Sequence, residues 1–173
     1  MLLVIADASS LILLEKIALL DTLLSHDMDF MIPLEVQKEA VEKGKMKKYP
    51  DAFKLEEKIS QGRIAVKEAK DNDLVKNLMT LFKIGAGEAE AISLFRQEKA
   101  DLLATDDRLA INACRALNIP ISGSAAFVVN SFDQGFINKD QGVQMLGILS
   151  EEGRYKGDII FKYKQTQVSW LQK

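Results

Sequence analysis

The sequence predicts an α/β domain in which parallel strands are covered by helices. Short apolar segments alternate with amphipathic ones through most of the 173 residues, and this alternation is typical of parallel strands joined by helical crossovers. The length corresponds to about one domain. The chain is 47% apolar and 28% charged, with only 10 Gly and 3 Pro. This composition indicates a packed core and excludes collagen-like, low-complexity and disordered chains.

Five short segments are predicted to be strands. The first, residues 1–6, is apolar throughout and is followed by Asp7, which is typical of a strand buried on both faces of a sheet. The other four are residues 30–32, 64–66, 102–105 and 120–122. No linker rich in Pro, Gly or Ser and no internal repeat interrupts the chain, so we expect a single domain that ends in helices.

The segments between the strands carry helix start and stop signals. Ser9 or Ser10 is expected to cap a helix over residues 11–20. Pro33 is expected to open a helix that runs to about residue 43 and is closed by Gly44. A short extra turn is expected over residues 21–25. One further helix is expected to begin at a cap, Asp71 or Asn72, and to run to Phe82. The other expected helices are residues 49–61, 88–97, 108–117, 124–134, 139–152 and 158–171.

The few reactive side chains exclude several classes of site. With His26 and Cys114 as the only residues of their kinds, a structural zinc cluster of four such ligands is excluded. A single cysteine allows no internal disulfide, which fits the reducing cytoplasm, and we expect Cys114 in the core. His26 lies in a predicted loop and is expected to be solvated rather than catalytic. The apolar runs are too short for a membrane span, and no signal peptide is visible.

Carboxylates are therefore the main candidates for chemistry. Asp7 and the pair Asp106 and Asp107 follow the two most apolar predicted strands. In an open parallel sheet, ligands bind outside the carboxyl ends of the strands where the strand order reverses. If these strands are neighbours, their terminal carboxylates meet there. Alternatively, each Asp caps the helix that follows it.

Two glutamates lie beside apolar stripes of predicted helices. Glu39 shares the flank of Val36 and Ala40, and Glu88 leads an apolar stripe from the first turn, where the helix dipole favours an anion. Either one could instead reach water from the rim of its stripe. Taken together, the acids suggest a site for Mg²⁺ or Mn²⁺, since crowded carboxylates repel one another and these ions prefer oxygen ligands. Such a site is typical of phosphodiester hydrolysis.

Four segments resemble the PIN-domain family. They read Ile-Ala-Asp-Ala-Ser-Ser over residues 5–10, Pro-Leu-Glu-Val-Gln-Lys-Glu over 33–39, Gly-Glu-Ala-Glu-Ala-Ile over 87–92 and Leu-Ala-Thr-Asp-Asp over 103–107. Together with residues 119–124, they are most like a branch of free-standing PIN proteins that has a helical C-terminal extension. The resemblance implies a three-layer α/β/α fold with a parallel sheet of four to five strands. It also implies a nuclease domain over residues 1–135, with residues 136–173 as an extension packed on it.

The same resemblance implies a metal-dependent endoribonuclease. Many members are toxins of toxin–antitoxin pairs, so it implies an RNA substrate, an antitoxin protein as partner and a homodimer. The implied catalytic residues are Asp7, Glu39, Glu88 and Asp107, the metal ligands are Asp7, Glu88 and Asp107 or its neighbour Asp106, and the supporting hydroxyls are Ser9 and Thr105. The Thr-x-Asp spacing favours Asp107 over Asp106. Glu90, about 200° round the helix from Glu88, is expected to point elsewhere.

Residues 43–70 form a basic stretch, with nine basic and four acidic side chains. Lys45, Lys47 and Lys48 are candidates for guiding an RNA backbone towards the acids. The alternative is a solvated loop and helix face. Tyr49 and Phe53 are the only aromatic residues among these lysines, and Phe53 is expected in the core.

Two further interpretations belong to other classes of protein. One is a PIN-like module that binds RNA or protein without significant catalysis. The other is a phosphotransfer domain with Asp7 as the acceptor, which is disfavoured because the dehalogenase pattern requires a second Asp where Ser9 stands.

Overall fold

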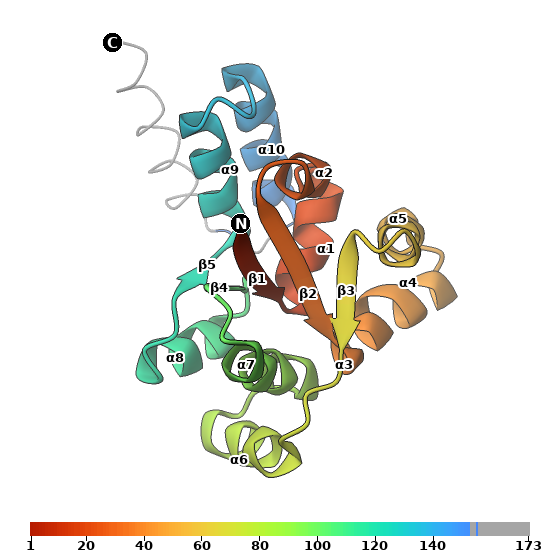
Figure 1. Cartoon of the computed structure of the whole chain (residues 1–173). Helices are drawn as coiled ribbons and strands as arrows, with labels where there is room; N and C mark the ends of the chain where they lie inside the picture. The colour runs from red at the N-terminus through yellow and green to blue at the C-terminus, as the bar shows by residue number, and fades with distance from the viewer. Residues whose placement is uncertain (153–154, 156–173) are drawn as a thin grey trace.

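The computed structural model describes residues 1–152 and 155 of the chain. Its centre is a five-stranded, wholly parallel sheet with the strand order β3-β2-β1-β4-β5 (Figure 1). The strands are β1 (Leu2–Ala6), β2 (Met28–Pro33), β3 (Ile64–Lys67), β4 (Leu102–Ala104) and β5 (Ile121–Ser122). The predicted parallel sheet is therefore confirmed, and every predicted strand segment belongs to it.

Helices cover both faces of the sheet, which confirms the expected three-layer α/β/α fold. They are α1 (Ala8–Lys16), α2 (Leu20–Leu24), α5 (Pro50–Ser60), α6 (Asn72–Phe82), α7 (Ala86–Glu98), α8 (Arg108–Ala116), α9 (Ser124–Asp133) and α10 (Lys139–Glu151). Because side chains alternate along a strand, Val4 belongs to the part of the core that includes residues of α1, α5, α9 and α10. Ile5 belongs to the part of the core on the opposite face, which includes residues of α6, α7 and α8.

The first helix begins earlier than the sequence predicts. Asp7, rather than Ser9 or Ser10, is the N-cap, and its carboxylate accepts a hydrogen bond from the Ser10 backbone N–H. A carboxylate caps a helix as well as a hydroxyl does. The two serines therefore lie in the first turn of α1, and this helix ends at Lys16.

The helix after β2 is also longer than predicted. It runs without a break through α3 (Leu34–Gln37), the π-helical segment η1 (Lys38–Glu42) and α4 (Lys43–Met46). Gly44 does not close it but lies inside α4, where a β-carbon would stand 2.6 Å from the β-carbon of Ala52 on α5. The missing side chain thus allows α4 and α5 to pack closely.

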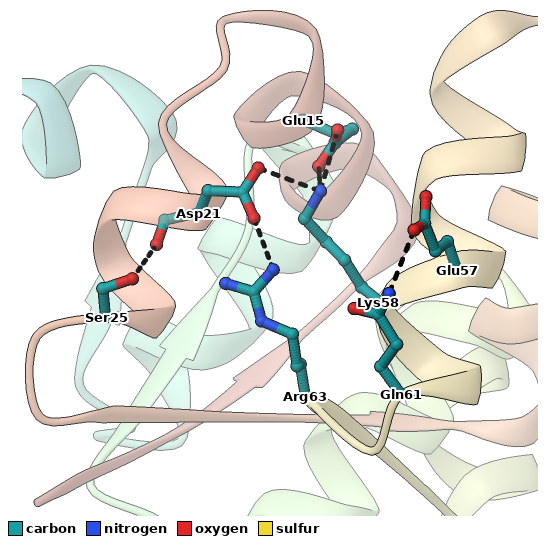
Figure 2. A network of polar contacts seen from close by, with 7 residues as sticks. All are labelled: Glu15, Asp21, Ser25, Glu57, Lys58, Gln61 and Arg63. Atoms are coloured by element: carbon teal, nitrogen blue, oxygen red, sulfur yellow. Dashed lines mark hydrogen bonds and ion pairs between the residues drawn. The ribbon is translucent and has the colours of Figure 1, made fainter.

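The outer face of α5 also differs from the prediction. Phe53 is 48% exposed and does not lie in the core, because its neighbours Ala52 and Leu55 occupy the inward face of the helix. Lys58, which the sequence placed in the basic stretch, is only 6% exposed. Figure 2 shows its ammonium between Glu15 of α1 and Asp21 of α2, at 3.0 and 3.1 Å.

The C-terminal helices complete one layer of the fold. α10 packs on α9 and sends Met145, Leu146 and Leu149 into the core on that face of the sheet. The predicted helix over residues 158–171 lies outside the described residues. Among the described helices, none is long and apolar enough to cross a membrane.

His26 and Cys114 have structural positions. The His26 ring is half-buried and stacks on Phe136 at 3.9 Å between centroids, and its Nδ1 lies 2.7 Å from the Thr22 carbonyl oxygen. It is therefore packed rather than simply solvated. Cys114 is buried in the core as predicted, and burial raises the pKa of its thiol to about 12.

Candidate functional site

Asp7 lies at the carboxyl end of the central strand, where the strand order reverses between β1 and β4. Its side chain is almost completely buried. Oδ1 accepts hydrogen bonds from Ser9 Oγ at 2.6 Å and the Ser10 N–H at 2.9 Å, while Oδ2 accepts one from Thr105 Oγ1 at 2.5 Å. Burial and, to a smaller extent, the negative charge of Glu88 raise the pKa of Asp7 to about 7 against the opposing effect of these bonds.

Two hydroxyls join Asp7 to the loop after β4. Ser9 Oγ accepts a hydrogen bond from the backbone N–H of Asp106 at 3.0 Å, and Thr105 Oγ1 accepts one from that of Asp107 at 3.1 Å. Each hydroxyl also donates to Asp7, so it bridges the end of β1 to the end of β4. Ser9 and Thr105 therefore connect the ends of the two strands through hydrogen bonds, and their role as supporting groups stays a prediction.

The neighbouring carboxylates of Asp106 and Asp107 are used differently. Asp107 caps α8, where its Oδ1 accepts the Ala110 N–H at 2.8 Å. Its Oδ2 makes no hydrogen bond with any residue that the structure describes. Asp106 instead binds α9: Oδ1 accepts from the Ser124 N–H and the Tyr155 hydroxyl, and Oδ2 accepts from Ser124 Oγ. Asp107 thus retains an oxygen for a further ligand, while both oxygens of Asp106 are occupied.

Glu39 of η1 and Glu88 of α7 are brought near each other because α3, which continues into η1, packs on α7. A β-carbon at Gly87, in the first turn of α7, would stand 3.0 Å from Glu39 Oε2. Burial and then the negative charge of Glu88 raise the pKa of Glu39, while Lys43 opposes this effect. Within residues 1–152 and 155, neither carboxylate has a hydrogen-bond partner.

Glu90 has a structural role that the sequence did not predict. Its Oε2 accepts the backbone N–H of Glu35 at 3.0 Å, so α7 supplies a cap to the first turn of α3. This contact holds the start of the helix that carries Glu39. The sequence indicates that a cap is needed, because Pro33 opens a helix whose first N–H groups require acceptors. It does not indicate which residue supplies the acceptor, since Glu90 is 55 residues away from Glu35.

The acids form a connected but open arrangement. Asp7 and Asp107 are linked through Thr105, and Glu88 is electrostatically coupled to both Asp7 and Glu39. Over the described part of the chain, however, no three acidic, histidine or cysteine side chains stand close enough to share one metal ion. The donors are all oxygens that repel one another, a chemistry that fits Mg²⁺ or Mn²⁺.

The lysines predicted to bind substrate lie beyond Glu39, at the junction of α4 and α5. Lys45 forms an ion pair with Glu56 at 2.5 Å, and Lys47 and Lys48 are exposed. Other members of the basic stretch are used by the fold in ion pairs with Glu15, Asp21 and Glu98; they are Lys58, Arg63 and Lys67. The basic stretch is thus partly neutralised.

A comparison with known protein families matches nearly the whole chain. The family model described as DUF3368, a PIN domain, covers residues 3–163. No curated protein and no solved structure matches the chain.

Proposed function

Because the chain belongs to the PIN-domain family, whose members are in general nucleases, we propose that it is a metal-dependent endoribonuclease that hydrolyses RNA phosphodiester bonds. The observation that carries the proposal is the position of buried Asp7. It ends the central strand, shares Thr105 with Asp107, and is electrostatically coupled to Glu88. Family membership and this arrangement of acids support the same chemistry. The alternative of a phosphotransfer domain does not agree with the family.

In this proposal Asp7, Glu88 and Asp107 would hold Mg²⁺ or Mn²⁺, and their carboxylates, which do not converge on one point among the described residues, would have to move closer together to share the ion. Asp107 is favoured over Asp106 because its Oδ2 makes no hydrogen bond within the described residues, whereas Asp106 is bonded to Ser124. When bound there, a divalent cation would offset the repulsion between the carboxylates and would supply an activated water and charge stabilisation for the leaving oxygen.

The remaining roles belong to groups of the chain itself. Ser9 and Thr105 keep the Asp7 carboxylate in one orientation through their hydrogen bonds. Glu39, with its raised pKa, is suited to accept a proton at Oε2 from the attacking water. Lys47 and Lys48 are suited to contact the RNA backbone electrostatically, since both are exposed and have no ion-pair partner in the described residues.

The test is cleavage of a labelled RNA by the full chain with Mg²⁺, with Mn²⁺ and with EDTA. We expect cleavage that requires the metal and is lost in Asp7→Asn and in Glu88→Gln. Asp140→Asn is a matched control, because this aspartate is exposed on α10 and its side chain makes no hydrogen bond or ion pair within the described residues. Cleavage that persists in EDTA, or in both site variants, contradicts the proposal.

A second candidate function is a PIN-like module that binds RNA or protein without significant catalysis. It is favoured by one observation, the lack of three converging metal-binding side chains among residues 1–152 and 155. The same experiment separates the two functions. RNA binding without cleavage, under conditions where the metal is present in excess, supports the module and rejects the nuclease.

The proposal includes a cellular role, which comes from the resemblance to free-standing PIN toxins. In this role the chain acts in the cytoplasm as a homodimer and is restrained by an antitoxin protein. We expect that induced expression of the chain arrests the growth of a host cell, and that Asp7→Asn relieves the arrest. Normal growth at an expression level confirmed by immunoblot contradicts the toxin role, while the nuclease assay remains a separate test.

A further inference from the structure

The junction of α4 and α5 exposes three large apolar side chains beside a group of lysines. Met46 is 84% exposed, Tyr49 is 49% exposed, and Phe53 is 48% exposed. Tyr49 is the N-cap of α5 and Phe53 lies in the first turn of that helix, so both rings belong to its N-terminal end. We call Met46, Tyr49 and Phe53 the α4–α5 platform.

The backbone under the platform is held by defined contacts. The Tyr49 N–H donates to the Gly44 carbonyl at 3.0 Å, and the Lys48 N–H donates to the Lys45 carbonyl at 2.9 Å. Lys48 has a left-handed conformation (φ 59°), which reverses the chain after α4. Gly44 then allows Ala52 of α5 to pack against α4. The aromatic rings therefore extend from an ordered corner, which lowers the entropy lost when a ligand binds.

One lysine ammonium lies near each aromatic ring. Lys45 Nζ lies 5.7 Å from the centroid of Phe53, and Lys47 Nζ lies 6.0 Å from that of Tyr49. Lys45 is partly neutralised by Glu56, but Lys47 and its neighbour Lys48 have no ion-pair partner within the described chain. The platform thus combines exposed π-faces with cations, a surface suited to a ligand that is both flat and anionic.

We propose that the α4–α5 platform binds single-stranded RNA, with unpaired bases stacked on Tyr49 and Phe53 and backbone phosphates beside Lys47 and Lys48. A single strand offers base faces and phosphates together, whereas a duplex keeps its base faces stacked inside. The choice of RNA over other single-stranded nucleic acids rests on the proposed function. The location of the binding surface is independent of that function, because it is inferred from the exposed rings and the lysines.

One continuous helix joins Met46 of the platform to Glu39 of the candidate acidic site. α4 extends the same helix that carries Glu39 in η1, and Met46 follows Glu39 by seven residues, or about 10 Å along the axis. A strand that stacks on the platform can therefore extend along the helix to the acids. This arrangement makes the platform a specificity element that selects unpaired RNA for the site.

The test is binding of the full-length Asp7→Asn variant, in EDTA, to a fluorescent unstructured RNA and to the matched duplex, followed by anisotropy. In this background Tyr49→Leu and Phe53→Leu keep the apolar surface but remove the ring. We expect each to weaken binding of the single strand by about five-fold or more and to leave the salt dependence unchanged. Lys47→Gln should instead reduce the slope of log affinity against log salt concentration by about 0.7. Leu81→Ala, at an exposed position on α6, is the control and should bind like the parent.

Any one of three results would overturn the proposed RNA-binding role of the platform. They are equal affinity for the single strand and the duplex, parental affinity in both leucine variants, and no RNA binding by the parent. If Tyr49→Ser and Phe53→Ser change only the sedimenting mass, the surface is a protein interface and the proposal is wrong. If the proposed nuclease function is wrong but the platform is right, the pattern differs: the binding results are as expected, but the parent chain cleaves no RNA in the presence of metal.

Discussion

The carboxylate of Glu39 lies over the backbone of Gly87, so that a β-carbon at residue 87 would stand 3.0 Å from Oε2. This contact brings an acid from η1 to the first turn of α7, where Glu88 follows directly in the sequence. The glycine is therefore needed for space rather than for an unusual backbone angle. It explains how two glutamates from distant segments come to be neighbours.

Replacing Gly87 tests this contact without removing an acidic group. Gly87→Ala should leave stability unchanged or raise it by up to about 1 kcal/mol, because alanine favours the helix. The new β-carbon displaces the Glu39 carboxylate, so we expect metal-dependent cleavage to fall on the order of 10- to 100-fold. Gly147→Ala in α10, where nothing lies within 4 Å of the added carbon, should keep full cleavage. Parental cleavage by Gly87→Ala would show that the position of Glu39 is unimportant.

The buried Asp7 predicts a pH-dependent stability in the absence of metal. Its pKa in the folded chain is about 7, above the ordinary 3.8, so the folded state holds the proton more tightly than the unfolded state does. The contribution to stability is complete below pH about 4 and is lost as the pH rises through about 7. Asp7→Asn should remove this loss, with a gain on the order of 2 kcal/mol at pH 8 in EDTA.

Urea unfolding from pH 5 to pH 8 measures this effect. The parent should lose stability relative to Asp7→Asn as the pH rises, and Mg²⁺ should restore the parent more than the variant, because a ligand stabilises the state that binds it. A constant difference between the two proteins over this pH range would contradict the raised pKa.

Substitutions at Asp106 and Asp107 separate a structural carboxylate from a metal ligand. Asp107→Asn should keep the cap of α8, since Asn caps a helix about as well as Asp, but it should abolish metal-dependent cleavage. Asp106→Asn weakens charge-assisted hydrogen bonds to Ser124 and should reduce stability by about 1.5 to 3 kcal/mol, with cleavage retained in the folded fraction. Thermal melts and initial cleavage rates measure both effects, and the reverse pattern would assign the metal to Asp106.

The ion pairs of Lys58 predict a large loss of stability from a single substitution. Lys58→Met leaves the buried carboxylate of Glu15 without its partner (Figure 2), and should cost about 3 to 5 kcal/mol. The double variant with Glu15→Leu should recover most of this loss. Lys16→Met, at the exposed pair with Glu152, is the control and should cost less than about 1 kcal/mol. Urea unfolding of the parent, the two single variants and the double variant measures these differences in stability. A small effect of Lys58→Met alone would refute the stabilising role of the ion pair between Lys58 and Glu15.

The thiol of Cys114 should be inert in the folded protein. Burial removes it from solvent and raises its pKa to about 12, so little thiolate is present at neutral pH. We expect no reaction with a thiol reagent at pH 8 until urea unfolds the chain. Rapid labelling of the native protein would indicate that α8 opens readily.

The order of strands and helices could be predicted because its signals are local. The apolar runs before Asp7 and before Asp106, and the proline that opens α3, each depend on residues within a few positions. The parallel sheet then follows from the alternation of elements. The acidic residues at the ends of β1 and β4 could be named for the same reason, because each directly follows an apolar run. That these two strands are neighbours in the sheet is a finding of the structure.

The errors arose where a contact from elsewhere in the chain decides the position. Gly44 continues a helix instead of ending it, because Ala52 packs against its bare backbone. Phe53 points outward since Leu55 takes the inward face of α5. The sequence predicts that Lys58 lies on the surface, yet it is buried because the negative charges of Glu15 and Asp21 compensate its positive charge.

By itself, the sequence determined the α/β class, the element order and the set of acidic candidates. Only the tertiary structure decided how each carboxylate is used: Asp7 buried against Thr105, Asp107 as a cap with one oxygen available, and Glu39 against Gly87. The physical reason is that a helix or strand forms from its own neighbours along the chain. The proton affinity and bonding of a carboxylate depend instead on burial and on groups such as Thr105, which reaches Asp7 from 98 residues away.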